Sequence, residues 1–367
     1  MNQLVIRLSF CLCLLGEPVS LFADHLAGAE ISYSYIGNLT NTPNHYRVEL
    51  RLYRDVAGAP LPGTQNVRVY SSCYPELSLQ LFRSIPPGEL PFGDQGYTTP
   101  EFYECVSPNM TGLTISIHYY SGTVILPGDC HDFRFYWWGG ARNASNNLSA
   151  APAQSLFVHA TLNNTTGPNS SPSFILPGAK AFCAGSQFQW SQQTTEGDGD
   201  SLFYRLVSPL AGSSFPPMQL TYNPGFSANQ PLSTAPGTGG VQLDSSTGLL
   251  VFTTAFVQQV AVLAVEVQEF RRIPSGGYAH VGSSMRDMQV AIASACRQEV
   301  IDGPQLSSDA PGFAIDTLSG DLVHAVVNQP VPHDSIADTD SRTAVAYGLG
   351  SIPYDCYQKR IRLLFDQ

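Results

Sequence analysis

Alternation of apolar and polar residues is the clearest pattern along the chain. In the segment 45–55, Tyr46, Val48, Leu50 and Leu52 fall on one side, and charged residues such as Glu49 fall on the other. A period of two is typical of a β-strand with one face in the core and one in water. This segment therefore predicts a strand of a half-buried sheet.

A second alternating segment follows an acidic, glycine-rich turn at 196–200. Leu202, Tyr204 and Leu206 share one side of it, as expected for a strand that leaves a tight turn. A similar turn at 244–248 separates two apolar segments. Further strands are predicted at 66–70, 77–82, 113–119, 123–126, 133–137, 156–162, 260–270 and 288–293. Since no long segment shows helical spacing of apolar residues, we predict an all-β fold.

Composition supports this fold class. Charged residues are 13% of the 367 positions, about half the usual fraction, and the chain has 32 Gly and 27 Pro. Few charges with many turn-forming residues favour short strands and uncharged polar loops over helices. The hydrophobic fraction of 43% can supply a sizeable core, so a disordered chain is not expected.

Charge excludes one class of partner. The net charge is −11 and the only lysines are Lys180 and Lys359. Nucleic-acid affinity depends on a basic surface, which this composition does not supply. We therefore expect no nucleic-acid partner.

The first 23 residues predict a secretory signal peptide. Arg7 precedes an apolar run at 8–15, and Ala23 marks a cleavage point. No other stretch is apolar over the length needed to cross a membrane. We expect a secreted or outer-surface protein with no transmembrane span after cleavage; an uncleaved N-terminal strand is the alternative interpretation.

Polar turn-forming residues at 163–173 indicate a domain boundary. We predict an N-terminal β-sandwich domain at 24–171 and a second sandwich at 172–298. Residues 299–367 are predicted to form a small or incomplete third β unit.

Several short motifs carry a resemblance to a known family. They are the sequence His25-x-x-Gly28-x-Glu30, the tripeptide Tyr53-Arg-Asp55, the acidic turn at 196–200 and the tripeptide Glu269-Phe-Arg271. Together they resemble secreted Bacteroidetes cell-surface proteins of the gliding-motility and adhesin type, which contain PKD-like and cadherin-like repeats. The resemblance implies tandem immunoglobulin-like β-sandwiches.

The same resemblance implies a non-enzymatic function in adhesion, surface structure or gliding-associated attachment. Surface glycans or other cell-surface proteins are the partners it implies. The sequence contains no G-x-S-x-G, H-E-x-x-H or phosphate-loop motif, so we expect no enzymatic activity. A carbohydrate-binding accessory module is the first alternative, and an extracellular hydrolase is the second.

The acidic turn is a candidate calcium site. Glu196, Asp198 and Asp200 place three carboxylates on one short loop, and Ca²⁺ prefers such oxygen ligands. The alternative is a solvated turn in which the acidic side chains bond to their own backbone. Calcium is the one cofactor that the sequence suggests.

An aromatic surface is the candidate ligand-binding site. Trp137 and Trp138 are adjacent in a predicted strand, so one of them points inward and the other outward. Trp138, together with Tyr120 on another predicted strand, could stack against a sugar.

The cysteines beyond the signal peptide indicate disulfides. An even number in an exported chain favours disulfide bonds, and no C-x-x-C pair suggests zinc. We predict a Cys183–Cys296 bond, because these residues bracket the second domain, and a Cys73–Cys105 bond. Cys130 and Cys356 would then pair with each other or remain free. The six residues are Cys73, Cys105, Cys130, Cys183, Cys296 and Cys356.

Overall fold

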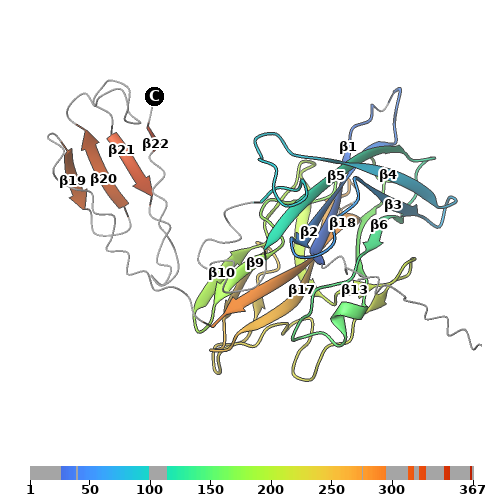
Figure 1. The fold of residues 1–367 in the computed structure, drawn as a ribbon. Helices are drawn as coiled ribbons and strands as arrows, with labels where there is room; N and C mark the ends of the chain where they lie inside the picture. Colours follow the sequence, from blue (N-terminus) through green and yellow to red (C-terminus); the bar gives the residue numbers. More distant parts are fainter. Residues whose placement is uncertain are drawn as a thin grey trace, which may run out of the picture.

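A computed structural model of the chain describes residues 26–38, 40–98, 114–274 and 276–294 in full, and the backbone of four short strands further on (Figure 1). Regular structure in the described residues is almost entirely extended; one 3₁₀ turn spans Ala151–Ala153. The all-β prediction is confirmed. The predicted signal peptide and the cysteines at 105 and 296 lie outside the described residues.

Eight strands form a closed ring. Seven of them come from the first half of the chain: β1 (Leu26–Tyr35), β2 (His45–Asp55), β3 (Thr64–Tyr70), β4 (Leu77–Ser84), β5 (Ile115–Ile125), β6 (Phe133–Gly139) and β7 (Leu156–Leu162). Their hydrogen-bonded order is β1-β2-β5-β4-β3-β6-β7. The long strand β18 (Tyr278–Ala293) pairs with β7 and with β1 and so closes the ring.

The interior of the ring holds the first core. On β2, Tyr46, Val48, Leu50 and Leu52 are fully buried, which confirms the predicted inward face. They pack with apolar residues of β1, β3, β6 and β7. Each such side chain contributes about 1.5–3 kcal/mol by leaving water, so this core is a main source of stability.

The later strands that surround the second core are β8 (Ser173–Phe174), β9 (Lys180–Cys183), β10 (Gln187–Ser191), β11 (Thr194–Thr195), β12 (Ser201–Val207), β15 (Gln242–Leu243), β16 (Leu249–Thr253) and β17 (Gln259–Arg272). The short strands β13 (Leu210–Ala211) and β14 (Met218–Gln219) pair with each other, and β13 also pairs with β7. β10, β16 and β15 form a small sheet. Its residues Trp190 and Phe252 share the second core with Leu263 of β17 and Val290 of β18.

The β17–β18 hairpin connects the ring to the second core: β18 is a strand of the ring, and apolar residues of both β17 and β18 pack in the second core. One edge of β18 pairs with β17 over almost its whole length. Its other edge pairs first with β7, then with β1, and finally in parallel with β9. Figure 1 shows β18 beside β1, its partner in the sheet. From Val281 to Ala293 every residue of β18 is buried, because both faces and both edges of the strand are covered.

Two predicted strands are one in the structure. The sequence predicts separate strands at 113–119 and 123–126, whereas β5 runs without a break from Ile115 to Ile125 and pairs with β2 throughout. Gly122 lies between the two predicted strands, where a glycine suggests a break. A Cβ added at this position would come within 2.7 Å of the Gln80 carbonyl oxygen on β4. The glycine permits close approach of β4 and does not interrupt the strand.

The backbone further along the chain forms a four-stranded antiparallel sheet in the order β19-β20-β21-β22. Its strands are β19 (Phe313–Thr317), β20 (Leu322–Val327), β21 (Thr343–Tyr347) and β22 (Leu364–Phe365). Within the described part of the chain, no helix has the length and apolarity required to cross a membrane.

Candidate functional site

The acidic turn between β11 and β12 is held by one of its own side chains. The Glu196 carboxylate accepts hydrogen bonds from the backbone N–H groups of Asp198 (2.5 Å), Gly199 (2.8 Å) and Asp200 (3.0 Å). Gly199 has a φ of 81°, a conformation that glycine adopts without strain. The turn is therefore compact, and its carboxylates are fixed in position.

Asp200 forms an ion pair with the end of β17. Arg271 donates from Nε to Oδ1 at 3.0 Å and from Nη2 to Oδ2 at 2.7 Å. The same guanidinium donates to the Pro168 carbonyl oxygen at 2.9 Å and to Asn169 Oδ1 at 2.6 Å. A two-pronged pair of this kind is strong and directional, so it fixes the turn against both β17 and the segment 168–169.

The carboxylate of Glu269 lies beside the acidic turn, on its buried side. It is fully buried on β17, and its Oε2 accepts a hydrogen bond from Asn169 Nδ2 at 2.8 Å. Its Oε1 has no hydrogen-bond partner. Burial is the main reason that the pKa of Glu269 is raised, to about 9, since a buried carboxylate loses its hydration.

Three carboxylates meet at this point. One oxygen each from Glu196, Asp200 and Glu269 lies within 4.8 Å of the others. We call these three residues the acidic cluster. Asp198, which the sequence places with them, instead accepts a hydrogen bond from the Ser170 N–H at 2.6 Å and lies 3.9 Å from Arg271. Carboxylate oxygens so arranged can bind a hard cation.

Sequence reasoning missed Glu269 as a site residue. It continues the inward alternation of Leu263, Val265 and Val267 on β17. A carboxylate in a core-facing register is costly unless it has a partner. A charged residue at an inward-facing position of the alternating pattern is therefore the signal that could have identified Glu269 as a site residue.

The acidic cluster lies where the chain crosses from the first core to the second. The Tyr33 N–H of β1 donates to Ser171 Oγ at 2.9 Å, and the Tyr35 N–H donates to Ser170 Oγ at 3.1 Å. Asn169 bonds to Glu269, and Ser170 bonds to Asp198. The crossing segment 168–171 is thus bonded to β1 on one side and to the acidic turn and β17 on the other.

The structure does not bring Trp138 and Tyr120 together. Tyr120 belongs to the first core and is fully buried, and its hydroxyl donates to the Pro62 carbonyl oxygen at 2.8 Å. Tyr120 therefore cannot offer a ring face to a ligand, which corrects that expectation. Trp137 points inward and Trp138 is partly exposed, with its ring 5.8 Å from that of Tyr136.

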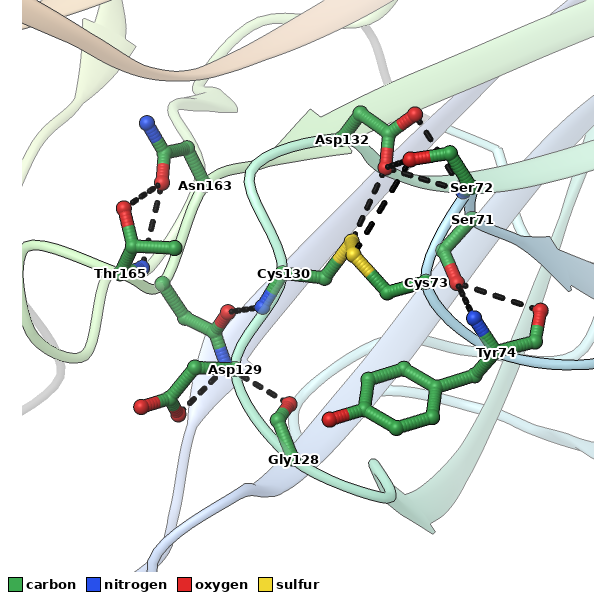
Figure 2. Close-up of a disulfide and its surroundings, with 11 residues drawn as sticks. Ser71, Ser72, Cys73, Tyr74, Gly128, Asp129, Cys130, Asp132, Asn163 and Thr165 are labelled. Carbon is green, nitrogen blue, oxygen red and sulfur yellow. Dashed lines mark hydrogen bonds between the residues drawn. A yellow bond between two sulfur atoms is a disulfide. The ribbon is translucent and has the colours of Figure 1, made fainter.

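The predicted Cys73–Cys105 bond is wrong, because Cys73 is bonded to Cys130 (Figure 2). Cys73 lies just after the end of β3 and Cys130 lies just before the start of β6. These ends are neighbours, since Tyr70 of β3 pairs with Arg134 of β6. The contact joins distant parts of the sequence through sheet pairing, so spacing alone could not predict it.

The surroundings of this disulfide are polar and ordered. Figure 2 shows Asp132 accepting hydrogen bonds from the backbone N–H and the hydroxyl of Ser72, each at 3.0 Å. The Cys130 N–H donates to Asn164 Oδ1 at 2.7 Å. The sulfurs of Cys73 and Cys130 and polar atoms of His131 and Asp132 lie close enough to suggest a metal site, but bonded sulfurs are not thiolate ligands.

Cys183 is also disulfide-bonded. Because Cys73 and Cys130 are bonded to each other, its partner lies outside the described residues. Ala293 pairs with Cys183 across β18 and β9, and Cys296 comes three positions later in the sequence. The Cys183–Cys296 bond stays a prediction.

Comparisons with protein-family models, with curated proteins and with solved structures find no match to the chain.

Proposed function

We propose that the chain is a secreted or surface-displayed, non-enzymatic protein that acts in adhesion or surface structure, including gliding-associated attachment. The connection of the ring to the second core through the β17–β18 hairpin supports this function. β17 pairs with β18 from Gln259 to Arg272, and the ring strands β1 and β7 pair with the same β18. A load on one core would pass to the other through paired strands and not through a flexible linker.

Buried ion pairs and a disulfide further support a load-bearing function. The Arg142–Asp287 and Arg286–Glu30 pairs connect β18 to the segment after β6 and to β1. Cys73–Cys130 ties two turns at one end of the ring. Such connections would resist separation of the strands under load.

An attachment assay tests this proposal. Beads coated with the purified chain are expected to bind bacterial surfaces or isolated surface polysaccharide, and the soluble chain should compete. Beads coated with an unrelated β-sandwich of similar size and charge provide the control. Attachment no greater than that of the control beads would reject adhesion. Release of reducing ends from the polysaccharide would instead identify a hydrolase.

A carbohydrate-binding module is the second candidate, and the aromatic groups around Trp138 favour it. Tyr136 stacks on Trp138, and Phe215 stacks on Tyr70 with ring centroids 5.0 Å apart. The Arg134 guanidinium lies 4.6 Å from the centre of the Phe215 ring. Aromatic rings beside charged hydrogen-bond donors suit stacking on a sugar combined with hydroxyl recognition.

A glycan array separates this candidate from general adhesion. Trp138→Ala is expected to abolish glycan binding, whereas Phe203→Ala, which removes another exposed aromatic ring on β12, should leave it unchanged. Equal binding by the wild type and both variants would reject Trp138 as the anchor. The absence of glycan binding by the wild type would reject the carbohydrate-binding function.

A further inference from the structure

The carboxylate of Glu269 lies in an unfavourable environment. Its side chain is inaccessible to water and one of its carboxylate oxygens has no hydrogen-bond partner. Among the described residues, no ion pair joins Glu269 to a basic side chain. An isolated buried carboxylate is unfavourable and must acquire a proton or a cation.

The nearest cation is already engaged. Arg271 is directed at Asp200 and at the oxygens of Pro168 and Asn169. When Glu269 is ionised, Glu196, Asp200 and Glu269 place three negative charges beside this one positive charge. A divalent cation among them would make the total charge of the group zero.

We propose that Glu196, Asp200 and Glu269 bind one Ca²⁺ ion. The donors are all carboxylate oxygens, which suit Ca²⁺ and not the nitrogen and sulfur preference of zinc. Ligands on opposite sides of Ca²⁺ are about 4.8 Å apart, twice a bond of about 2.4 Å. The three oxygens lie within that separation of one another, so all three can reach a single ion with little movement.

Calcium is favoured over magnesium by the form of the site. Mg²⁺ requires nearly ideal octahedral geometry at about 2.0–2.1 Å. Glu196 and Asp200 are held by the turn amides and by Arg271, so they cannot contract freely around a smaller ion. Ca²⁺ accepts longer and irregular bonds, and the exposed side of the turn leaves room for water ligands.

The ion would connect three separate parts of the chain. Glu196 and Asp200 come from the acidic turn, Glu269 comes from β17, and Asn169 of the crossing segment bonds to Glu269. Calcium would therefore stiffen the junction between the two cores. The site does not depend on adhesion, because it rests on the charge and geometry of these residues alone.

Titration of the purified full chain with Ca²⁺, after removal of bound metal with a chelator, tests the site. We expect the melting temperature to rise with Ca²⁺ concentration, because an ion that binds only the folded state stabilises it. A chelator should reverse the rise, and Mg²⁺ should give a smaller one. No rise in the wild type would overturn the proposal.

Glu269→Gln is the decisive variant, since it keeps the shape of the side chain and removes the charge. Calcium affinity is expected to fall about ten-fold or more, as for other changes at metal sites. Asp244→Asn, in an exposed acidic turn that caps its own backbone, should bind calcium like the wild type. Wild-type affinity in Glu269→Gln would place any calcium elsewhere and overturn the proposal. Should that variant not fold, Glu196→Gln provides the same test.

Discussion

Arg142 and Asp287 form an ion pair that is almost completely shielded from water. Arg142 donates from Nη1 to Oδ1 at 2.8 Å and from Nη2 to Oδ2 at 2.7 Å. The carbonyl oxygens of Ser155 and Leu210 accept two further hydrogen bonds from the guanidinium. Because the hydrogen-bonding groups are so well satisfied, the pair is tolerated inside the protein.

Removing one partner of this pair should destabilise the fold strongly. Arg142→Met is expected to lower the free energy of unfolding by about 3–5 kcal/mol, because Asp287 is left buried without a counter-charge. Urea unfolding measured by circular dichroism would quantify the loss. The double variant Arg142→Met with Asp287→Leu should lose less, since no charge is then stranded. A double variant as unstable as the single one would contradict this explanation.

His118 makes stability depend on pH. It is fully buried on β5, with its Nε2 2.9 Å from Ser116 Oγ and no partner at Nδ1. Burial, and then the nearby Arg83 and Arg54, lower the pKa of His118 to about 4. As pH falls below about 6.5, the unfolded chain takes up a proton that the folded chain does not take until about pH 4. Stability is therefore lost over this interval.

His118→Gln should reduce that loss. The wild type is expected to lose about 3 kcal/mol through this residue between roughly pH 7 and pH 4, and the variant should not lose that part. Urea unfolding at several pH values would measure the difference. The exposed His131 is the control, since His131→Gln should behave like the wild type. Identical pH profiles for the wild type and His118→Gln would exclude this assignment.

The sequence identifies charged motif residues but not their partners. Glu30, Glu269 and Arg271 belong to the short motifs, and in the structure each bonds to a residue from a distant segment. Likewise Asn169, in an Asn-x-Ser tripeptide, is a buried hydrogen-bond hub. Residue type indicates a special role, but only tertiary pairing specifies it.

At the level of elements, alternation predicts strands with one wet face and fails for strands buried on both faces. β2 and β12 alternate clearly, and the sequence predicts both of them. In β18 it predicts only 288–293, because Ser283, Ser284 and Arg286 make the earlier part resemble a loop. These polar residues are buried and bond to residues of distant segments, which local sequence does not reveal.

Gly28 is an element-level feature that the structure explains. A Cβ at this position would come within 2.4 Å of the Asp287 carbonyl oxygen on β18. The glycine of the His25-x-x-Gly28-x-Glu30 motif thus permits β1 and β18 to pair closely. Since this pairing closes the ring, Gly28 of the motif has a structural role.

The disulfide between the β3–β4 and β5–β6 turns should contribute substantially to stability. It joins residues 57 positions apart, and closing a loop of that length is expected to contribute about 4 kcal/mol by restricting the unfolded chain. The double variant Cys73→Ala with Cys130→Ala should lose about that much in urea unfolding. Ser72→Ala, which changes the same turn but keeps the bond, should lose far less. Mass spectrometry of unreduced peptides that found Cys73 linked to Cys105 would contradict this pairing.

At the scale of the whole molecule, the boundary predicted near residue 171 lies at the crossing segment. A boundary at this place does not indicate that a later strand, β18, pairs with strands of the ring. β18 pairs with β1 although Arg286 and Glu30 are 256 residues apart. Pairing over such a distance leaves no local signal in the sequence. Whether 24–171 and 172–298 act as separate domains stays a prediction, and the shared hairpin argues for one cooperative unit.

Cutting the chain at that boundary distinguishes separate domains from one cooperative unit. In a fragment of residues 24–171 the ring lacks β18, so β1 and β7 keep unpaired edges and the first core is open to water. Exposed edges promote aggregation, and we expect this fragment to be unfolded or aggregated by circular dichroism and size-exclusion chromatography.

A fragment of residues 24–298 should unfold in one calorimetric transition, because both cores depend on the same strand. Co-expression of 24–171 with 172–298 should restore a soluble complex, since the second fragment supplies β18. A stable, monomeric 24–171 fragment would show that the first core does not need β18, and two separate transitions in 24–298 would show that the cores fold independently.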